Sequence, residues 1–283
     1  MEISHRCLLF VPGSKPERFE KAMSASPDMV CIDLEDAVVV NQKDEARRNV
    51  IAFLTRYVRT SQKIVVRINS LDTEWGVKDA SALSSIANPP DFVMLPKVKA
   101  ATDLKRAERS LAAGQHLIAL LECPRSILNA DAIAAECDAL KYLMFGGADF
   151  SMEMGCDMSW NALLAARGHL AMVAAKHSKG LIDVPFLDVN DTNGLETESR
   201  LVRRMGFTAK SAIHPSQVSA IQAIFTPNEE EAEHARKVIL AFENSGKDGA
   251  ILVDGRLVDK PVVLAAQKTL AAFNAGRASQ QAG

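Results

Sequence analysis

A set of acidic and basic residues, each placed at or just after the end of a short apolar run, carries most of the possible chemistry in this sequence. Carboxylates dominate the set, and a few cations accompany them. Carboxylate oxygens among apolar walls favour a hard divalent cation such as Mg²⁺, which takes one or two protein carboxylates and keeps its other positions for water and substrate oxygens. The members of the set are Asp33, Glu35, Asp36, Arg67, Lys97, Glu122, Asp149, Asp183 and His214.

The apolar runs that precede these residues have the length and composition of buried parallel strands. Segments with helical spacing of apolar residues separate them, which predicts an α/β fold, a (β/α)8 TIM barrel. A doubly wound open sheet is the competing architecture, but its GxGxxG fingerprint is absent. The predicted strands are Cys7–Val11, Met29–Leu34, Ile64–Ile68, Phe92–Leu95, Leu117–Leu121, Tyr142–Phe145, Leu181–Val184 and Ser211–Ile213. The predicted helices are 16–25, 43–57, 101–113, 127–137, 159–177 and 196–205.

We expect the barrel to span residues 1–225 and a C-terminal helical extension to span residues 226–283. Within the extension, the pattern predicts a charged amphipathic helix, then a loop, then a second helix. Asp254 lies in that loop directly before a glycine and is expected to be a turn residue. The three segments are 228–243, 246–260 and 261–275.

Composition narrows the classes of partner. The net charge of −2 gives no general attraction to nucleic acid or to an anionic membrane, and no apolar stretch reaches membrane-spanning length. The five cysteines form no CxxC pair and are odd in number, which argues against a disulfide framework and a thiolate zinc site. Without an N-terminal signal pattern, we expect a cytoplasmic protein.

All strand ends of one polarity open onto the same face of a barrel, where active sites form, so the charged set is expected to converge there. Glu122 and Asp149 follow neighbouring strands and can therefore meet at one ion, although the residues alone do not choose this pair among the acids. A single acid at a strand end more often caps a helix or faces solvent. Asp36 fits that interpretation, because a helix soon follows it.

The cations of the set suggest an acidic substrate. Arg67 presents a planar fork that matches a carboxylate, so beside a metal it would hold an α-keto or α-hydroxy acid. An internal ion pair with Glu35 or Asp36 is the alternative. The turn at Ser14–Lys15 opens a helix and could hold an anion. His214 is expected to orient other groups at the site, rather than to act as a general base.

Seven segments, in order along nearly the whole chain, resemble the citrate lyase β-subunit-like group of the HpcH/HpaI aldolase superfamily. That group includes malyl-CoA and citramalyl-CoA lyases. The segments are RCLLFVPGSKPERFEKA (6–22), DLEDAV (33–38), VRIN (66–69), LPK (95–97), LLECP (120–124), FGGADF (145–150) and AIHPSQ (212–217).

The resemblance implies roles for individual residues. Glu122 and Asp149 would bind Mg²⁺, with Mn²⁺ as an alternative ion, and Arg67 would bind the carboxylate of the 2-oxo acid. The resemblance also implies that Phe10, Ser14 and Lys15 lie near the CoA thioester. Glu35, Asp36, Lys97 and His214 are expected to surround the substrate because they belong to the strand-end set.

The segment ILVDGRLVDKPVV (251–263) resembles the C-terminal lid of the malyl-CoA lyases. In those enzymes, the aspartate matching Asp259 enters the site of a neighbouring subunit as the acid/base. The resemblance thus implies a catalytic role for Asp259 and a homo-oligomer, either a trimer or a hexamer.

The expected function is a Mg²⁺-dependent carbon–carbon lyase that cleaves or forms a 3-hydroxyacyl-CoA such as malyl-CoA or citramalyl-CoA. The products of cleavage would be a 2-oxo acid (glyoxylate or pyruvate) and acetyl-CoA. One alternative is a citrate lyase β subunit acting on the citryl thioester of an acyl carrier protein, but the lid favours a self-contained CoA enzyme. Others are a pyruvate aldolase acting on free 2-keto acids and a non-catalytic subunit, which the acids at 122, 149 and 259 argue against.

Overall fold

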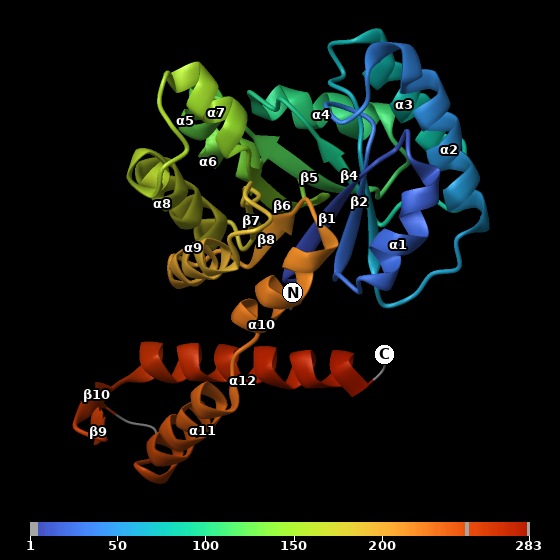
Figure 1. The fold of residues 1–283 in the computed structure, drawn as a ribbon. Coiled ribbons are helices and arrows are strands. Elements are labelled where there is room, and N and C mark those ends of the chain that lie inside the picture. The colour runs from blue at the N-terminus through green and yellow to red at the C-terminus, as the bar shows by residue number, and fades with distance from the viewer. Residues whose placement is uncertain (1–4, 247–248, 282–283) are drawn as a thin grey trace. The chain divides into compact units, whose positions relative to one another are not determined.

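The computed structural model describes residues 5–246 and 249–281, and its central feature is a closed barrel of eight parallel strands (Figure 1). The strands follow one another around the barrel in chain order, and β1 closes it by pairing with both β2 and β8. The predicted barrel is therefore confirmed, and the open sheet is excluded. The strands are β1 (Cys7–Pro12), β2 (Met29–Asp33), β3 (Lys63–Arg67), β4 (Phe92–Leu95), β5 (His116–Leu121), β6 (Leu140–Phe145), β7 (Gly180–Asp183) and β8 (Ala209–Ala212).

The register of neighbouring strands brings polar strand ends together. Asp33 at the end of β2 lies directly opposite Arg67 at the end of β3. Leu121 at the end of β5 pairs with Phe145 at the end of β6, so the segments that begin at Glu122 and Gly146 leave the barrel side by side.

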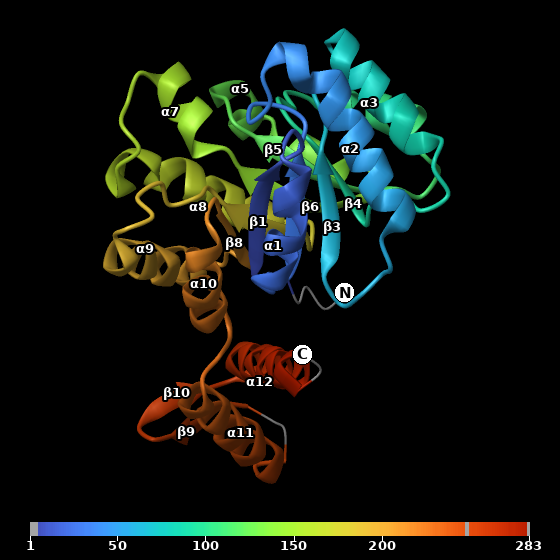
Figure 2. The same ribbon diagram turned by 45° about the vertical axis from the view of Figure 1, so that its right-hand side comes forward.

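Helices lie outside the strands, as Figures 1 and 2 show for α2 and α3 next to β2–β4. Each predicted helical segment contains a helix, and the structure adds α3, α7 and α10, which the apolar spacing did not indicate. Short turns of 3-10 helix are η1 (Pro16–Arg18), η2 (Val40–Gln42) and η3 (Pro215–Gln217). The α-helices of this part of the chain are α1 (Phe19–Ser24), α2 (Lys43–Arg56), α3 (Glu74–Ser84), α4 (Ala101–Ser110), α5 (Pro124–Leu128), α6 (Ala130–Ala135), α7 (Gly147–Met154), α8 (Trp160–Lys176), α9 (Thr192–Arg204) and α10 (Val218–Phe225).

A buried network of charges lies between the barrel and its helices. Lys210 in β8 donates to Asp183 at 2.7 Å and to Glu198 of α9 at 2.8 Å, and Arg167 of α8 donates to Asp183 at 2.9 Å. The prediction that Asp183 joins the charged set is therefore wrong, because its side chain is fully buried against α8 and α9. The eighth strand begins at Ala209 rather than Ser211, because the buried Lys210 interrupts the apolar pattern.

The chain divides into two compact units, and the barrel unit ends at Gln222. The second unit contains the described residues from Ala223 onward, where α11 (Glu229–Asn244) packs against α12 (Lys260–Gln281). Between them, β9 (Ile251–Val253) and β10 (Arg256–Val258) form a hairpin, where a loop was predicted. The expectation that Asp254 is a turn residue is confirmed, since Asp254 and Gly255 form the turn with φ of 51° and 75°, as two-residue hairpins often require.

None of the helices among the described residues combines the length and the apolar character needed to cross a bilayer.

One close contact inside the barrel wall gives a stability prediction. A Cβ at Gly180 would lie 2.2 Å from the ring of Tyr142, its partner on β6, so Gly180→Ala is expected to cost about 1–3 kcal/mol of unfolding free energy. Gly168 inside α8 is the matched control, because its nearest non-local atom would be 3.8 Å away. Gly168→Ala is expected to stabilise by roughly 0.5–1 kcal/mol. Urea unfolding measures both, and equal effects of the two substitutions would contradict the packing argument.

Candidate active site

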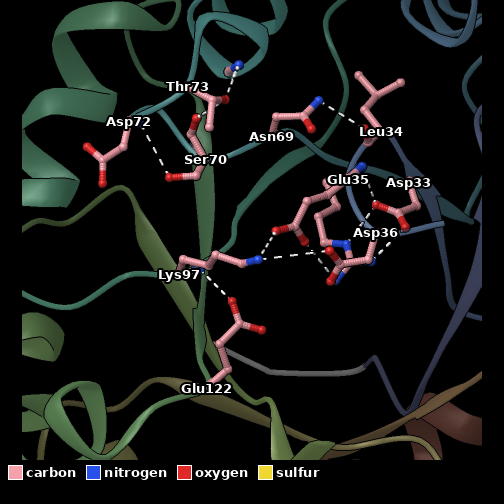
Figure 3. A network of polar contacts seen from close by, with 12 residues as sticks. Asp33, Leu34, Glu35, Asp36, Asn69, Ser70, Asp72, Thr73, Lys97 and Glu122 are labelled. Carbon is pink, nitrogen blue, oxygen red and sulfur yellow. Dashed lines mark hydrogen bonds and ion pairs between the residues drawn. The ribbon is translucent and has the colours of Figure 1, made fainter. Parts of the chain in front are cut away.

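The central contact of the site is a two-point ion pair between the last residues of β2 and β3. Arg67 donates from Nε and Nη2 to the two carboxylate oxygens of Asp33, at 2.7 and 2.6 Å. The same carboxylate accepts the backbone N–H groups of Glu35 and Ala37 at 2.8 and 2.9 Å. Asp33 therefore fixes both the guanidinium of Arg67 and the loop that carries Glu35. Figure 3 shows Asp33 and Glu35 in this network of polar contacts.

Arg67 also faces two further acids. Its Nη1 lies 3.1 Å from Oε2 of Glu35 and 3.8 Å from Oδ2 of the exposed Asp36. Glu35 is buried, and despite that proximity its Oε2 makes no hydrogen bond of acceptable geometry. Burial raises the pKa of Glu35 to about 7, although Arg67 acts in the opposite direction. The internal ion pair anticipated for Arg67 is thus present, and its principal partner is Asp33.

A buried set of hydrogen bonds holds the loops that carry this cluster. Lys43 at the start of α2 donates to the backbone oxygens of Leu34 and Glu35, both at 3.0 Å, and to Asn69. Asn69 in turn donates from its backbone and its side chain to Asp79 of α3, at 2.9 and 2.7 Å. The strand-end pattern did not indicate Lys43 and Asp79, which together with Asn69 hold the loops after β2 and β3 in place.

Glu122 directly follows β5, and its side chain lies close to Lys97 and within electrostatic range of Glu35 and Arg67. Its Oε1 accepts the backbone N–H of Lys97 at 2.6 Å, while Oε2 accepts no hydrogen bond in the described part of the chain (Figure 3). Burial, together with the negative charges of Glu35 and Asp149, raises the pKa of Glu122 to about 8. Asp149 lies in the first turn of α7, which directly follows β6. The structure therefore brings Glu35, Lys97 and Asp149 within electrostatic range of Glu122, as the strand order predicts.

Gly146 makes room for Glu122, which gives a prediction. A Cβ at Gly146 would lie 2.3 Å from the Cβ of Glu122, a contact that no rotamer change relieves. Gly146→Ala is expected to displace Glu122 and to weaken Mg²⁺ binding by at least about tenfold, which corresponds to roughly 1.4 kcal/mol. Calorimetric titration with Mg²⁺ measures the effect, with the exposed neighbour Ala148→Ser as the control. Unchanged affinity in Gly146→Ala would show that Glu122 is not a ligand.

The donors at this site suit Mg²⁺. Glu122 offers an oxygen that accepts no hydrogen bond, next to the carboxylates that raise its pKa, so a cation there would neutralise charge that the protein leaves uncompensated. No group of three or more His, Cys, Asp or Glu side chains able to hold a metal occurs in residues 5–246 and 249–281. Mg²⁺ usually binds through only one or two carboxylates, so the pair of Glu122 and Asp149 fits its requirements.

A cavity of about 350 Å³ adjoins this cluster. Phe10 connects the two, because its ring lines the cavity and lies under the guanidinium of Arg67, 5.2 Å from Cζ. His214 and the exposed cations Arg18 and Lys21 also line it. These two cations were not predicted from the sequence, although their spacing of three residues is typical of one helix face.

Ser14 and Lys15 lie outside this cavity, His214 lines it, and Asp259 belongs to the other unit of the chain. Lys15 is exposed. His214 accepts the backbone N–H of Ser216 at Nδ1, 3.2 Å away, so it caps η3. Asp259 belongs to the C-terminal unit, where its carboxylate accepts the N–H of Val262 at 3.3 Å, at the start of α12.

Comparison with known proteins supports this description. Residues 6–215 match the family described as HpcH/HpaI aldolase/citrate lyase. The chain is 34% identical over 270 residues to a (3S)-malyl-CoA thioesterase of Cereibacter sphaeroides, covering 94% of this chain and 93% of the relative. It is 31% identical over 286 residues to an L-malyl-CoA/β-methylmalyl-CoA lyase of the same species, covering 90% of each.

Among solved structures, the protein CitE from Mycobacterium tuberculosis in complex with magnesium, acetoacetate and coenzyme A has a TM-score of 0.83 and 30% identity. The similarity covers 97% of this chain and all of that one (100%). These relatives support a CoA-related lyase, and the chain belongs to the HpcH/HpaI aldolase/citrate lyase family.

Proposed function

We propose that this protein is a Mg²⁺-dependent lyase that cleaves a 3-hydroxyacyl-CoA, such as malyl-CoA or citramalyl-CoA, into a 2-oxo acid and acetyl-CoA. The observation that supports it most is the arrangement around Glu122. One of its oxygens is fixed by Lys97 and the other is unbonded, and Asp149 and Arg67 are close enough to influence its charge. A divalent ion and a substrate carboxylate are the two groups that this arrangement can accept together.

Each side chain has a distinct part in the proposed reaction. Arg67, held by Asp33, binds the carboxylate of the 2-hydroxy acid end through its remaining N–H groups. A Mg²⁺ ion on Glu122 and Asp149 would supply Lewis-acid stabilisation of the oxyanion that develops on the substrate. As the C–C bond breaks, the hydroxyl proton passes to solvent, and protonated Asp259 donates its proton to the α-carbon of the thioester enolate and is then reprotonated from solvent.

The cavity beside Phe10 suits the rest of a CoA thioester. Its wall is apolar along β1, and the cations Arg18 and Lys21 at its rim match the phosphates of CoA. Because Phe10 touches both the cavity and Arg67, a thioester lying there would place its acyl end at the carboxylate cluster. The similarity to a protein in complex with magnesium, acetoacetate and coenzyme A supports this proposal.

Thioester hydrolysis is a second candidate, because a relative at 34% identity is a malyl-CoA thioesterase. The two reactions release different products. A lyase yields glyoxylate and intact acetyl-CoA from malyl-CoA, whereas a thioesterase yields malate and free CoA, whose thiol can be titrated. Incubation with malyl-CoA, citramalyl-CoA and the free hydroxy acids is expected to give a 2-oxo acid from the CoA esters alone. Release of free CoA without 2-oxo acid would support hydrolysis instead, and cleavage of the free acids would indicate an aldolase.

The raised pKa of Glu122 predicts how Mg²⁺ binding depends on pH. Without the ion, Glu122 is mostly protonated below its pKa of about 8, and Mg²⁺ binds only the ionised carboxylate. Protons therefore compete with Mg²⁺, and the affinity is expected to fall by at least about tenfold between pH 8.5 and pH 6.5. Calorimetry in buffers of different ionisation enthalpy would also show proton release at pH 7. An affinity independent of pH over this range would contradict the prediction.

A further inference from the structure

Lys97 adopts a backbone conformation that lysine rarely takes. Its φ is +55°, in the left-handed region that glycine occupies without strain. Four non-glycine residues in the described part of the chain have a positive φ. They are Ser26, Lys97, Ser178 and Asp254, and Lys97 is the one that lies at a barrel strand end beside the carboxylate cluster. Strain at such a place is tolerated where the surrounding contacts require it.

In this conformation Lys97 contacts three carboxylates through two different groups. Its backbone N–H donates to Oε1 of Glu122 at 2.6 Å. Its ammonium lies 3.1 Å from Oε1 of Glu35 and 3.9 Å from Oδ1 of Asp36 (Figure 3). Glu35 therefore has Lys97 at one oxygen and Arg67 at the other, while Glu122 is held at one oxygen and open at the other.

We infer that Lys97 is a positioning residue with two separable parts, an inference that rests on the proposed role of Glu122 as a metal ligand. The left-handed backbone orients Glu122 so that Oε2 faces the ion. The ammonium neutralises Glu35, so that a substrate carboxylate can approach Arg67 without meeting an uncompensated negative charge. Glycine would satisfy the backbone alone, so the presence of lysine in this conformation indicates that the ammonium contributes too.

Substitutions can separate the two parts. Lys97→Gly keeps the N–H and the left-handed backbone but removes the ammonium, whereas Lys97→Val also penalises that backbone, because a β-branched residue avoids it. Lys97→Arg keeps a cation and serves as the conservative control. The readouts are calorimetric titration of the full chain with Mg²⁺, then with pyruvate or glyoxylate at saturating Mg²⁺, together with thermal unfolding.

Lys97→Gly is expected to bind Mg²⁺ within about threefold of the wild type, to unfold at a temperature no lower, and to lose at least about tenfold in affinity for the 2-oxo acid. Lys97→Arg should keep that affinity within about threefold. Lys97→Val should lose at least about tenfold in Mg²⁺ affinity; if it does not fold, the comparison of the glycine and arginine variants still tests the ammonium.

Two results would overturn the inference. Equal loss of Mg²⁺ binding in the glycine and valine variants would show that the backbone N–H is not what positions Glu122. Unchanged 2-oxo acid affinity in Lys97→Gly would show that the ammonium has no part. A wild-type protein that binds no Mg²⁺ would instead contradict the proposed function, and the inference with it.

Discussion

Glu122→Gln is expected to abolish measurable Mg²⁺ binding and to reduce turnover by about 10³-fold or more, which corresponds to roughly 4 kcal/mol of transition-state stabilisation. The amide has the shape of the carboxylate, and its oxygen can still accept the N–H of Lys97, so the fold is retained. What is lost is the charge that binds the ion. Because a neutral amide costs less to bury than a carboxylate, the free energy of unfolding should be unchanged or higher.

The control for this prediction is Glu153→Gln, the same chemical change at an exposed position on α7. It should leave Mg²⁺ affinity and turnover at wild-type levels. Calorimetry and a 2-oxo acid assay on the same preparations measure both quantities. Wild-type turnover in Glu122→Gln would show that the carboxylate of this residue is not needed for the reaction.

Arg67→Met is expected to be costly for stability and for activity. Asp33 is 1% exposed and loses its two-point partner, and breaking one side of a buried ion pair costs about 3–5 kcal/mol of unfolding free energy. The substrate carboxylate loses the guanidinium that would bind it. Turnover should therefore fall by about 10³-fold, as expected for the loss of a charge-assisted pair. Urea unfolding and steady-state kinetics measure the two effects.

A second substitution separates these effects. Adding Asp33→Asn to Arg67→Met removes the unpaired buried charge and should restore much of the lost stability, without restoring turnover. If the double variant recovered activity along with stability, Arg67 would have only a structural role. If Arg67→Met kept both the stability and the turnover of the wild type, the ion pair with Asp33 would contribute little to either.

The barrel could be predicted from the sequence because its strands are buried on both faces and therefore appear as continuous apolar runs. The predicted start of the eighth strand is wrong because a lysine, Lys210, interrupts the apolar run. The charge of Lys210 is balanced inside the protein by Asp183 and Glu198. Such a network depends on partners from β7 and α9, which no local pattern contains. The same network explains why Asp183, a strand-end acid like the others, lies outside the site.

The sequence was sufficient to predict that the strand-end residues converge at one face. It was not sufficient to predict which of these side chains contact one another. Register places Asp33 opposite Arg67, so the dominant ion pair depends on which residues face each other across two strands. The supporting Lys43 left a detectable signal, because it lies on the buried face of α2 with Ala46, Val50 and Leu54. The left-handed backbone of Lys97 left none, since lysine seldom adopts it. The role proposed for Asp259 rests on family resemblance.

The central claim is that the carboxyl end of the barrel holds a divalent ion on Glu122 and Asp149 next to Arg67. The most direct measurement is an anomalous difference map from crystals soaked with Mn²⁺ and a 2-oxo acid. We expect a single strong peak about 2 Å from one oxygen each of Glu122 and Asp149, with the carboxylate of the acid bound to Arg67. A map with no peak at these two side chains, or with Mn²⁺ bound elsewhere while the acid occupies Arg67, would contradict it.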